Sequence, residues 1–156
     1  MAVDTFMKID GVSGESADPQ FKEWIELLSI NWKVECPASA TAQHGLRSSE
    51  FGVTKAVDKA SPQIFKAMTH REPISEIRLA FCRAGKEKVK YLEYVFKKCV
   101  LTKFELQMAN KSEEPLPTEN IEFRFASVEI TYCQQKRDTG GSAGQIGATW
   151  NFSEGS

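Results

Sequence analysis

The chain has 156 residues, of which 41% are hydrophobic and 26% charged, as is typical of one folded domain and unlike a disordered chain. Its 20 basic and 21 acidic residues give a formal net charge of −1, which offers no bulk field for attracting nucleic acid or an anionic membrane. No apolar run is long enough for a transmembrane helix, and the N-terminus lacks the basic and apolar regions of a secretory signal. We therefore expect a single domain, residues 1–156, that is made and folded in the cytoplasm without membrane insertion.

The first part of the chain has the alternation of strands. Val3, Thr5, Met7 and Ile9 alternate with a second set of residues that is charged except for Phe6, which predicts a strand over residues 3–10. In residues 24–35 the even positions other than Glu26 carry Trp and aliphatic side chains, which predicts one long strand. Residues 36–49 have no periodicity and predict an extended loop, which is longer than a usual hairpin turn.

One segment departs from the strand pattern. Ser61 followed by Pro62 is a favourable N-cap and first helical residue, and Pro73 prevents continuation. Apolar side chains fall on one helical face in between, so we expect a single helix over residues 62–70.

Alternation then resumes to the end of the chain. The expected strands are 74–83, 89–97, 99–108, 121–134 and 146–152. Within 121–134 the apolar parity changes around Ala126 and Ser127, which indicates a bulge or a strand buried on both sides. The predicted fold is mainly β: an antiparallel β-barrel of about eight strands, closed or nearly closed, with one short α-helix.

The cysteine and histidine pattern does not indicate a metal or redox centre. Cysteines occur at positions 36, 82, 99 and 133, without a CxxC pair, and the two histidines, His44 and His70, lie 26 residues apart. Structural zinc requires ligands at short spacing, so we expect four free and mostly packed thiols and no cofactor.

Catalytic motifs are weak in this sequence. Cys36 lies eight residues before His44, but one such pair in a loop does not define a nucleophile and its base. The glycine-rich residues 138–147 precede a strand rather than a helix, so they do not predict a phosphate-binding loop. We therefore predict that the protein is not an enzyme.

An excess of apolar residues is the remaining signal. Phe6 lies between Asp4 and Lys8, and Ile25 and Leu27 lie opposite the even-numbered apolar face. These three side chains either pack beneath the helix and loops of their own chain or cover a subunit interface. They are the candidates for a lateral interface.

Several separated segments resemble one family in order along the chain. They are residues 1–9 (Met-Ala-Val-Asp-Thr-Phe-Met-Lys-Ile), Gly-Glu-Ser at 14–16, Phe-Gly-Val-Thr-Lys-Ala-Val-Asp-Lys-Ala-Ser-Pro at 51–62, 118–135 and Thr-Trp-Asn-Phe at 149–152. Together they resemble the haemolysin-coregulated proteins, Hcp, of type VI secretion systems.

The resemblance implies a non-enzymatic structural protein. Hcp subunits form hexameric rings that stack into a hollow inner tube within a contractile sheath, with a spike protein at the tip and small effector proteins in the lumen. Such a subunit is secreted without a cleaved signal peptide. In this chain the resemblance makes Ser29 and Asn31 candidates for facing the lumen and its effectors.

The extended loop at 36–49 is, by the same resemblance, the element that reaches the next ring. Its polar side chains Thr41, Gln43, His44 and Arg47 are the candidates for ring stacking. The alternative that the sequence leaves open is a monomeric β-barrel that carries or binds a small ligand in its interior.

Overall fold

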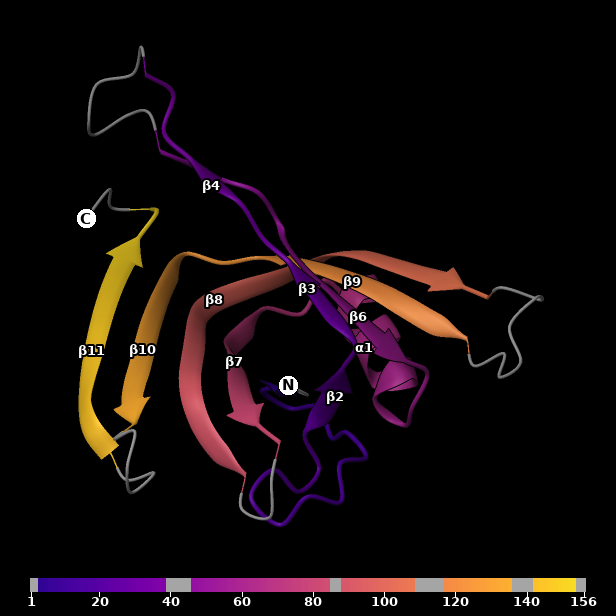
Figure 1. Cartoon of the computed structure of the whole chain (residues 1–156). Coiled ribbons are helices and arrows are strands. Elements are labelled where there is room, and N and C mark those ends of the chain that lie inside the picture. Colours follow the sequence, from indigo (N-terminus) through magenta and orange to yellow (C-terminus); the bar gives the residue numbers. More distant parts are fainter. Residues whose placement is uncertain (1–2, 39–45, 85–87, 109–116, 136–141, 154–156) are drawn as a thin grey trace.

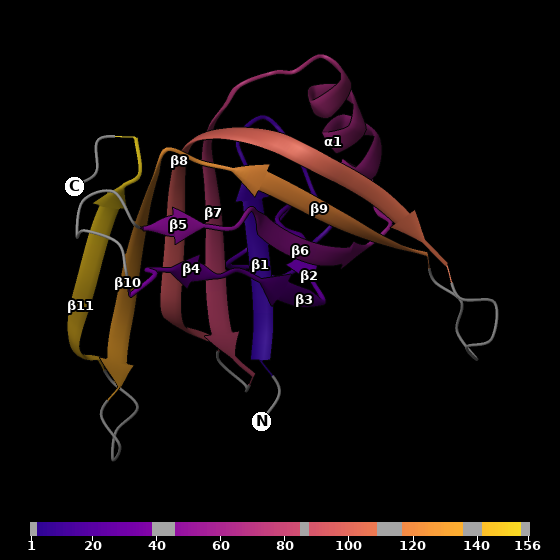
Figure 2. The same cartoon turned by 90° about the horizontal axis from the view of Figure 1, so that it is seen from above.

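The structure is a computed structural model that describes residues 3–38, 46–84, 88–108, 117–135 and 142–153. Within them one helix, α1 (Ala60–Thr69), accompanies antiparallel strands (Figures 1 and 2). The strands are β1 (Val3–Ile9), β2 (Ile25–Leu27), β3 (Ser29–Asn31), β4 (Val34–Glu35), β5 (Arg47–Ser48), β6 (Phe51–Ala56), β7 (Ile74–Arg83), β8 (Val89–Gln107), β9 (Thr118–Arg124), β10 (Ser127–Gln135) and β11 (Ser142–Asn151).

Strand β8 belongs to both halves of the main sheet. Its first part pairs with β7 on one side and β10 on the other, and its last part pairs with β9. The two strands predicted at 89–97 and 99–108 are therefore one strand, which bends at Lys98, where φ is 54°. The partner strand breaks at the same corner, because β9 ends and β10 begins around Ala126, whose N–H donates to the Lys97 carbonyl at 3.0 Å. The single strand predicted at 121–134 is therefore two strands, β9 and β10, and the parity change at Ala126 and Ser127 marks a corner between two sheet halves rather than a bulge or a strand buried on both sides.

The paired strands follow the order β2-β1-β7-β8-β9-β6-β3, and β10 and β11 branch from β8. The two end strands of this order, β2 and β3, follow each other in the chain with only Leu28 between them. The backbone N–H of Leu28 donates to the Thr54 carbonyl at 2.7 Å, so the sheet curls nearly into a ring without a complete ladder. The predicted mainly-β antiparallel class with one short helix is confirmed, while the predicted continuous strand over 24–35 is wrong.

Aromatic side chains fill the space inside the curled sheet. Phe51, Phe96 and Phe123 are fully buried there, with ring centroids 4.8–5.2 Å apart. Trp32 packs against this cluster from the start of the β4–β5 arm, with its ring centroid 5.7 Å from Phe51 and 5.9 Å from the neighbouring Phe125. Burial of such rings supplies the main stabilising free energy of the fold.

A smaller cluster covers the outer face of β1. The loop between β1 and β2 folds back so that Phe21 stacks on Phe6, with centroids 4.6 Å apart, and Trp24 meets Phe21 edge-on. Phe6 is only 2% exposed as a result, and Ile25 is 1% exposed inside the main core. The prediction that Phe6 and Ile25 lie at a lateral interface is therefore wrong, because their own chain covers both side chains. Leu27 is half-buried against the main core.

No helix in the described part of the chain is long and apolar enough to cross a membrane. The four cysteines are free thiols, with Cys82 and Cys99 buried, Cys133 partly buried and Cys36 exposed.

The thiols should differ in reactivity in the native protein. Burial raises the pKa of Cys99 to about 12 and also raises that of Cys82, so both stay protonated at pH 8, and the protonated thiol is a poor nucleophile. Alkylation at pH 8 followed by mass spectrometry should label Cys36 but neither Cys82 nor Cys99. After denaturation without reductant all four should be labelled, and a stoichiometric disulfide would contradict this expectation.

Candidate functional site

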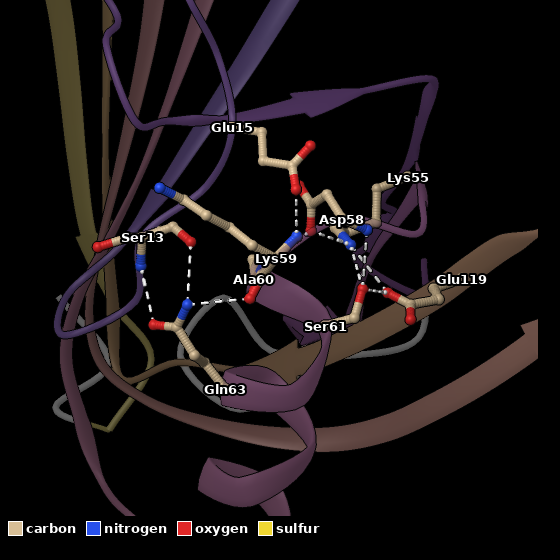
Figure 3. Close-up of polar contacts among 9 residues, drawn as sticks. All are labelled: Ser13, Glu15, Lys55, Asp58, Lys59, Ala60, Ser61, Gln63 and Glu119. Carbon is tan, nitrogen blue, oxygen red and sulfur yellow. Dashed lines mark hydrogen bonds and ion pairs between the residues drawn. The ribbon is translucent and has the colours of Figure 1, made fainter.

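A fully buried lysine joins α1 to the sheet. Lys55 on β6 is 0% exposed, and its ammonium lies 2.8 Å from Asp58 Oδ1, 2.8 Å from Glu119 Oε2 and 3.1 Å from Ser61 Oγ (Figure 3). An ammonium has three N–H donors, so each has an acceptor here. These acceptors come from the turn after β6, from the first turn of α1 and from β9.

Ser61 connects the partners of Lys55 to one another. Its hydroxyl donates to Glu119 at 2.9 Å and accepts the backbone N–H of Asp58 at 3.1 Å. Asp58 Oδ1 in turn accepts the N–H of Ala60 at 3.0 Å, so the Asp58 side chain caps a free amide at the helix start. The prediction of Ser61 as N-cap is therefore wrong, because α1 begins at Ala60 and Ser61 turns inward to the lysine cluster.

The loop between β1 and β2 holds the same end of the helix from outside. Glu15 Oε1 accepts the N–H of Lys59 at 2.8 Å, and the Gln63 amide exchanges two hydrogen bonds with the backbone of Ser13, both at 3.1 Å (Figure 3). The start of α1 is thus fixed to β6, to β9 and to this loop. The arrangement positions elements, and no described group of His, Cys, Asp or Glu side chains could hold a metal ion.

The opposite face of the β3–β6–β9 part of the sheet is polar. The strand registers align two rows of side chains across β3, β6, β9 and β8. One row is Ser29, Thr54, Asn120 and Glu105, and the other is Asn31, Gly52, Glu122 and Lys103. The two lumen candidates, Ser29 and Asn31, are both exposed and begin neighbouring rows on this polar face.

Hydrogen bonds run along the first row. The Thr54 hydroxyl donates to Asn120 Oδ1 at 2.8 Å, and the Asn120 amide donates to Glu105 Oε1 at 2.9 Å. This hydrogen bond from Asn120 is the main cause that lowers the pKa of Glu105, and the charge of nearby Lys103 adds to it. The first row is therefore a connected polar chain.

The second row borders a hollow of about 340 Å³ that both lumen candidates line, together with Gly52, Glu122 and Lys103. Lys103 lies 3.6 Å from Glu105 of the first row. Beyond Glu122, Arg124 holds Glu50 with an ion pair of 3.0 Å, and its hydrogen bond is the main cause that lowers the pKa of Glu50. The sequence did not single out Gly52 or Glu122, because only the register places them beside Asn31.

The predicted loop at 36–49 lies on a short hairpin arm. The arm is formed by the paired strands β4 and β5 and projects from the body (Figure 1). Its base is fixed by a hydrogen bond of 2.9 Å from Trp32 Nε1 to Ser48 Oγ. Of the stacking candidates, Arg47 is exposed on β5, and Thr41, Gln43 and His44 lie outside the described residues.

Sequence reasoning missed the exposed hairpin of β10 and β11. One face of this hairpin continues the core outward: Val128 is buried, whereas Tyr132 and Ile146, directly paired across the strands, are 40% and 71% exposed. Among the described strands β11 pairs only with β10, so it is also a sheet edge. The alternation of apolar residues after Ala126 could have identified this apolar stripe. It could not have shown which of these side chains the rest of the chain leaves exposed.

The sequence and the fold match one family. The family model for the type VI secretion system effector Hcp matches residues 6–132. The protein hcp1 of Pseudomonas aeruginosa is 29% identical, over 97% of this chain and 96% of its own length. The crystal structure of Hcp1 from Salmonella typhimurium superposes with a TM-score of 0.82 at 28% identity, covering 99% of this chain and 97% of that one. A structure described as a type six secretion system protein gives a TM-score of 0.87 at 27% identity, with 99% of both chains covered.

The curled antiparallel sheet, with its arm and the helix α1, is thus the fold of type VI secretion proteins of this kind. The chain belongs to the Hcp family.

Breaking the lysine cluster should destabilise the fold strongly. Lys55→Met leaves Glu119 and Asp58 without their cation, and removing one partner of a buried ion pair costs about 3–5 kcal/mol. Urea unfolding followed by tryptophan fluorescence should show this loss. Adding Glu119→Leu should recover part of it.

The matched control is Lys103→Met, which removes a half-exposed ion pair and should change stability by less than about 1 kcal/mol. Equal losses for the Lys55 and Lys103 variants would contradict the assignment of the buried cluster.

Proposed function

We propose that the protein is a structural subunit of the type VI secretion inner tube. It forms hexameric rings that stack into a hollow tube, and the lumen carries small effector proteins to be secreted with it. The observation that carries this proposal is the exposed apolar stripe on the β10–β11 hairpin, in a chain of the Hcp family, because such a stripe suits contact with a second copy of the chain.

The lateral contact is assigned to this hairpin. Val128 and Trp150 pack at the core end of the stripe, and the pair Tyr132 and Ile146 continues it beyond the point where the chain covers it. An exposed apolar face next to an unpaired strand edge is a liability for a monomer, and a neighbouring subunit removes it. A contact between two different patches closes into a ring when the rotation fits.

The projecting arm suits stacking of one ring on the next. It stands clear of the body, its root is anchored, and its described surface carries the ion pair of Lys33 and Glu35 at 3.0 Å beside the exposed Val34. A polar contact between rings can come apart after the tube has left the cell. The spike protein and the contractile sheath are the further partners of such a tube.

The polar face that holds Ser29 and Asn31 suits the tube wall. Its rows carry hydroxyl, amide and charged groups, so it resists permanent hydrophobic adhesion of cargo. The alternative of a monomeric carrier barrel is disfavoured, because Phe51, Phe96 and Phe123 fill the interior that a small ligand would need. The protein acts without catalysis, in the cytoplasm before firing and outside the cell afterwards.

The lateral contact is tested by oligomeric state. Wild-type protein should be a closed hexamer by native mass spectrometry and light scattering at micromolar concentration. Ile146→Asp should dissociate it, since a carboxylate would be buried without a partner in the contact. Phe65→Asp, which adds the same charge on the exposed face of α1, is the control and should leave the ring intact. A monomeric wild type would refute the ring.

The arm is tested by shortening it. Replacing residues 38–46 with a short Gly-Ser linker keeps β4, β5 and the Trp32–Ser48 hydrogen bond. We expect hexamers by light scattering, but no tubes by electron microscopy and reduced secretion. Loss of the hexamer would move the arm into the lateral contact, and unchanged tubes would leave the arm without a role in assembly.

A further inference from the structure

Gly52 occupies a position on β6 where the chain itself does not require a glycine. It is paired on both sides, with Asn31 of β3 and with Glu122 of β9, and neither ladder has a bulge there. Its φ does not lie in the left-handed region. Among the described glycines, Gly11 and Gly144 are the ones with a positive φ. Neither a turn nor a bulge explains the residue.

Packing within the chain does not explain it either. A Cβ at Gly52 would lie 3.4 Å from the Asn31 carbonyl oxygen and 3.7 Å from Glu122 Cγ, which are ordinary contacts. Gly14 is a useful contrast, since a Cβ there would lie 2.4 Å from the Trp24 carbonyl oxygen. Gly14 is therefore required by its own fold, whereas a side chain at Gly52 has room.

A glycine inside a strand weakens the strand. Where the fold itself does not need the glycine, its presence indicates that a ligand or another chain approaches the backbone closely. Gly52 is part of the lining of the 340 Å³ hollow on the polar face. That volume is at the small end of ligand sites, suitable for one long side chain rather than for a large cofactor.

The charged side chains around the hollow indicate which kind of group it could bind. Lys103 lines the hollow and pairs with Glu122 in the strand register, but its ammonium lies 3.6 Å from Glu105, and Arg124 is held by Glu50. Among the described residues no cation lies within ion-pair distance of Glu122, which borders the hollow and neighbours the Glu50 carboxyl. Asn31 and Ser29, which also line the hollow, add amide and hydroxyl oxygens that accept hydrogen bonds.

We propose that this hollow binds a Lys or Arg side chain of a cargo polypeptide. The methylene groups lie over Gly52, the cationic end pairs with Glu122, and Asn31 and Ser29 accept its remaining hydrogen bonds. This assignment rests on the proposed function for placing the hollow in the tube lumen. There a ring repeats it around the wall, so that weak single contacts add up on one cargo molecule.

The binding test uses a fluorescein-labelled peptide of three Gly-Ser-Arg repeats, measured by fluorescence anisotropy at low salt. Matched peptides carry Gln or Glu in place of Arg. We expect the Arg peptide to bind at least about tenfold more tightly than the Gln peptide, and the Glu peptide to bind least. Equal affinity for the Arg and Gln peptides overturns the proposal, and tighter binding of the Glu peptide would assign the hollow to Lys103 and an acidic side chain instead.

Two variants test the hollow itself. Gly52→Val puts a branched side chain into it without changing charge, and Glu122→Gln keeps its shape but removes the carboxylate. Each should weaken binding of the Arg peptide at least about tenfold. Glu129→Gln, which removes an exposed carboxylate from β10, is the matched control and should bind as wild type does. Unchanged affinity in both hollow variants overturns the proposal.

Gly52→Ala tests whether the glycine serves the fold. Because a Cβ has room there, the thermal midpoint should stay the same or rise, while the affinity for the Arg peptide falls. A lower midpoint would mean that the chain itself needs the glycine, which overturns the argument.

Light scattering on the same samples separates this proposal from the proposed function. Hexamers that do not discriminate among the peptides overturn the hollow alone. Monomers that bind the Arg peptide through Gly52 and Glu122 support the hollow and overturn the tube.

Discussion

The ammonium of Lys55 is the constraint on which the rest of the structure depends. A buried charge is tolerated only when every donor is satisfied, and here the three acceptors come from three different segments. Since side chains alternate along a strand, the register that sends Lys55 inward also sends Gly52 and Thr54 to the polar face. A slip of one residue would put Lys55 in solvent and Thr54 among the aromatic rings. The lysine therefore selects the register that creates both faces.

Alternation in the sequence was enough to predict some elements well. The strand predicted at 74–83 has those bounds, and the parity change at Ala126 marks a true corner. The prediction failed where distant segments decide the outcome. Residues 24–35 alternate as one strand. At Leu28, however, the pairing partner changes from β1 to β6, which divides the segment into short strands. Phe6 looked like an uncovered residue because nothing in the local sequence indicates that Phe21 folds back over it.

The candidate site was predictable only in part. Ser29 and Asn31 came from the family resemblance, and the structure places them on one polar face, which is compatible with the proposed lumen role. Gly52 and Glu122 could not be found in the same way, because they become neighbours of Asn31 only through pairing of β3, β6 and β9. Lys55 carried a weak signal: a lysine at an apolar position of an alternating strand, followed closely by Asp58 and Ser61, indicates a buried cation with its own partners.

The way the arm is rooted determines how mechanical load enters the subunit. Trp32 stands at the base of β4–β5 with its ring against Phe51 and Phe125 and its N–H bonded to Ser48. The base of the arm therefore cannot rotate without separating the Trp32 ring from Phe51 and Phe125, so it is fixed rather than hinged. In a column stacked through the arms, as proposed above, a force received by an arm would pass to the aromatic rings that Trp32 contacts. Such a joint would transmit displacement with little elastic loss and would fail by local unfolding around Trp32 rather than by swinging aside.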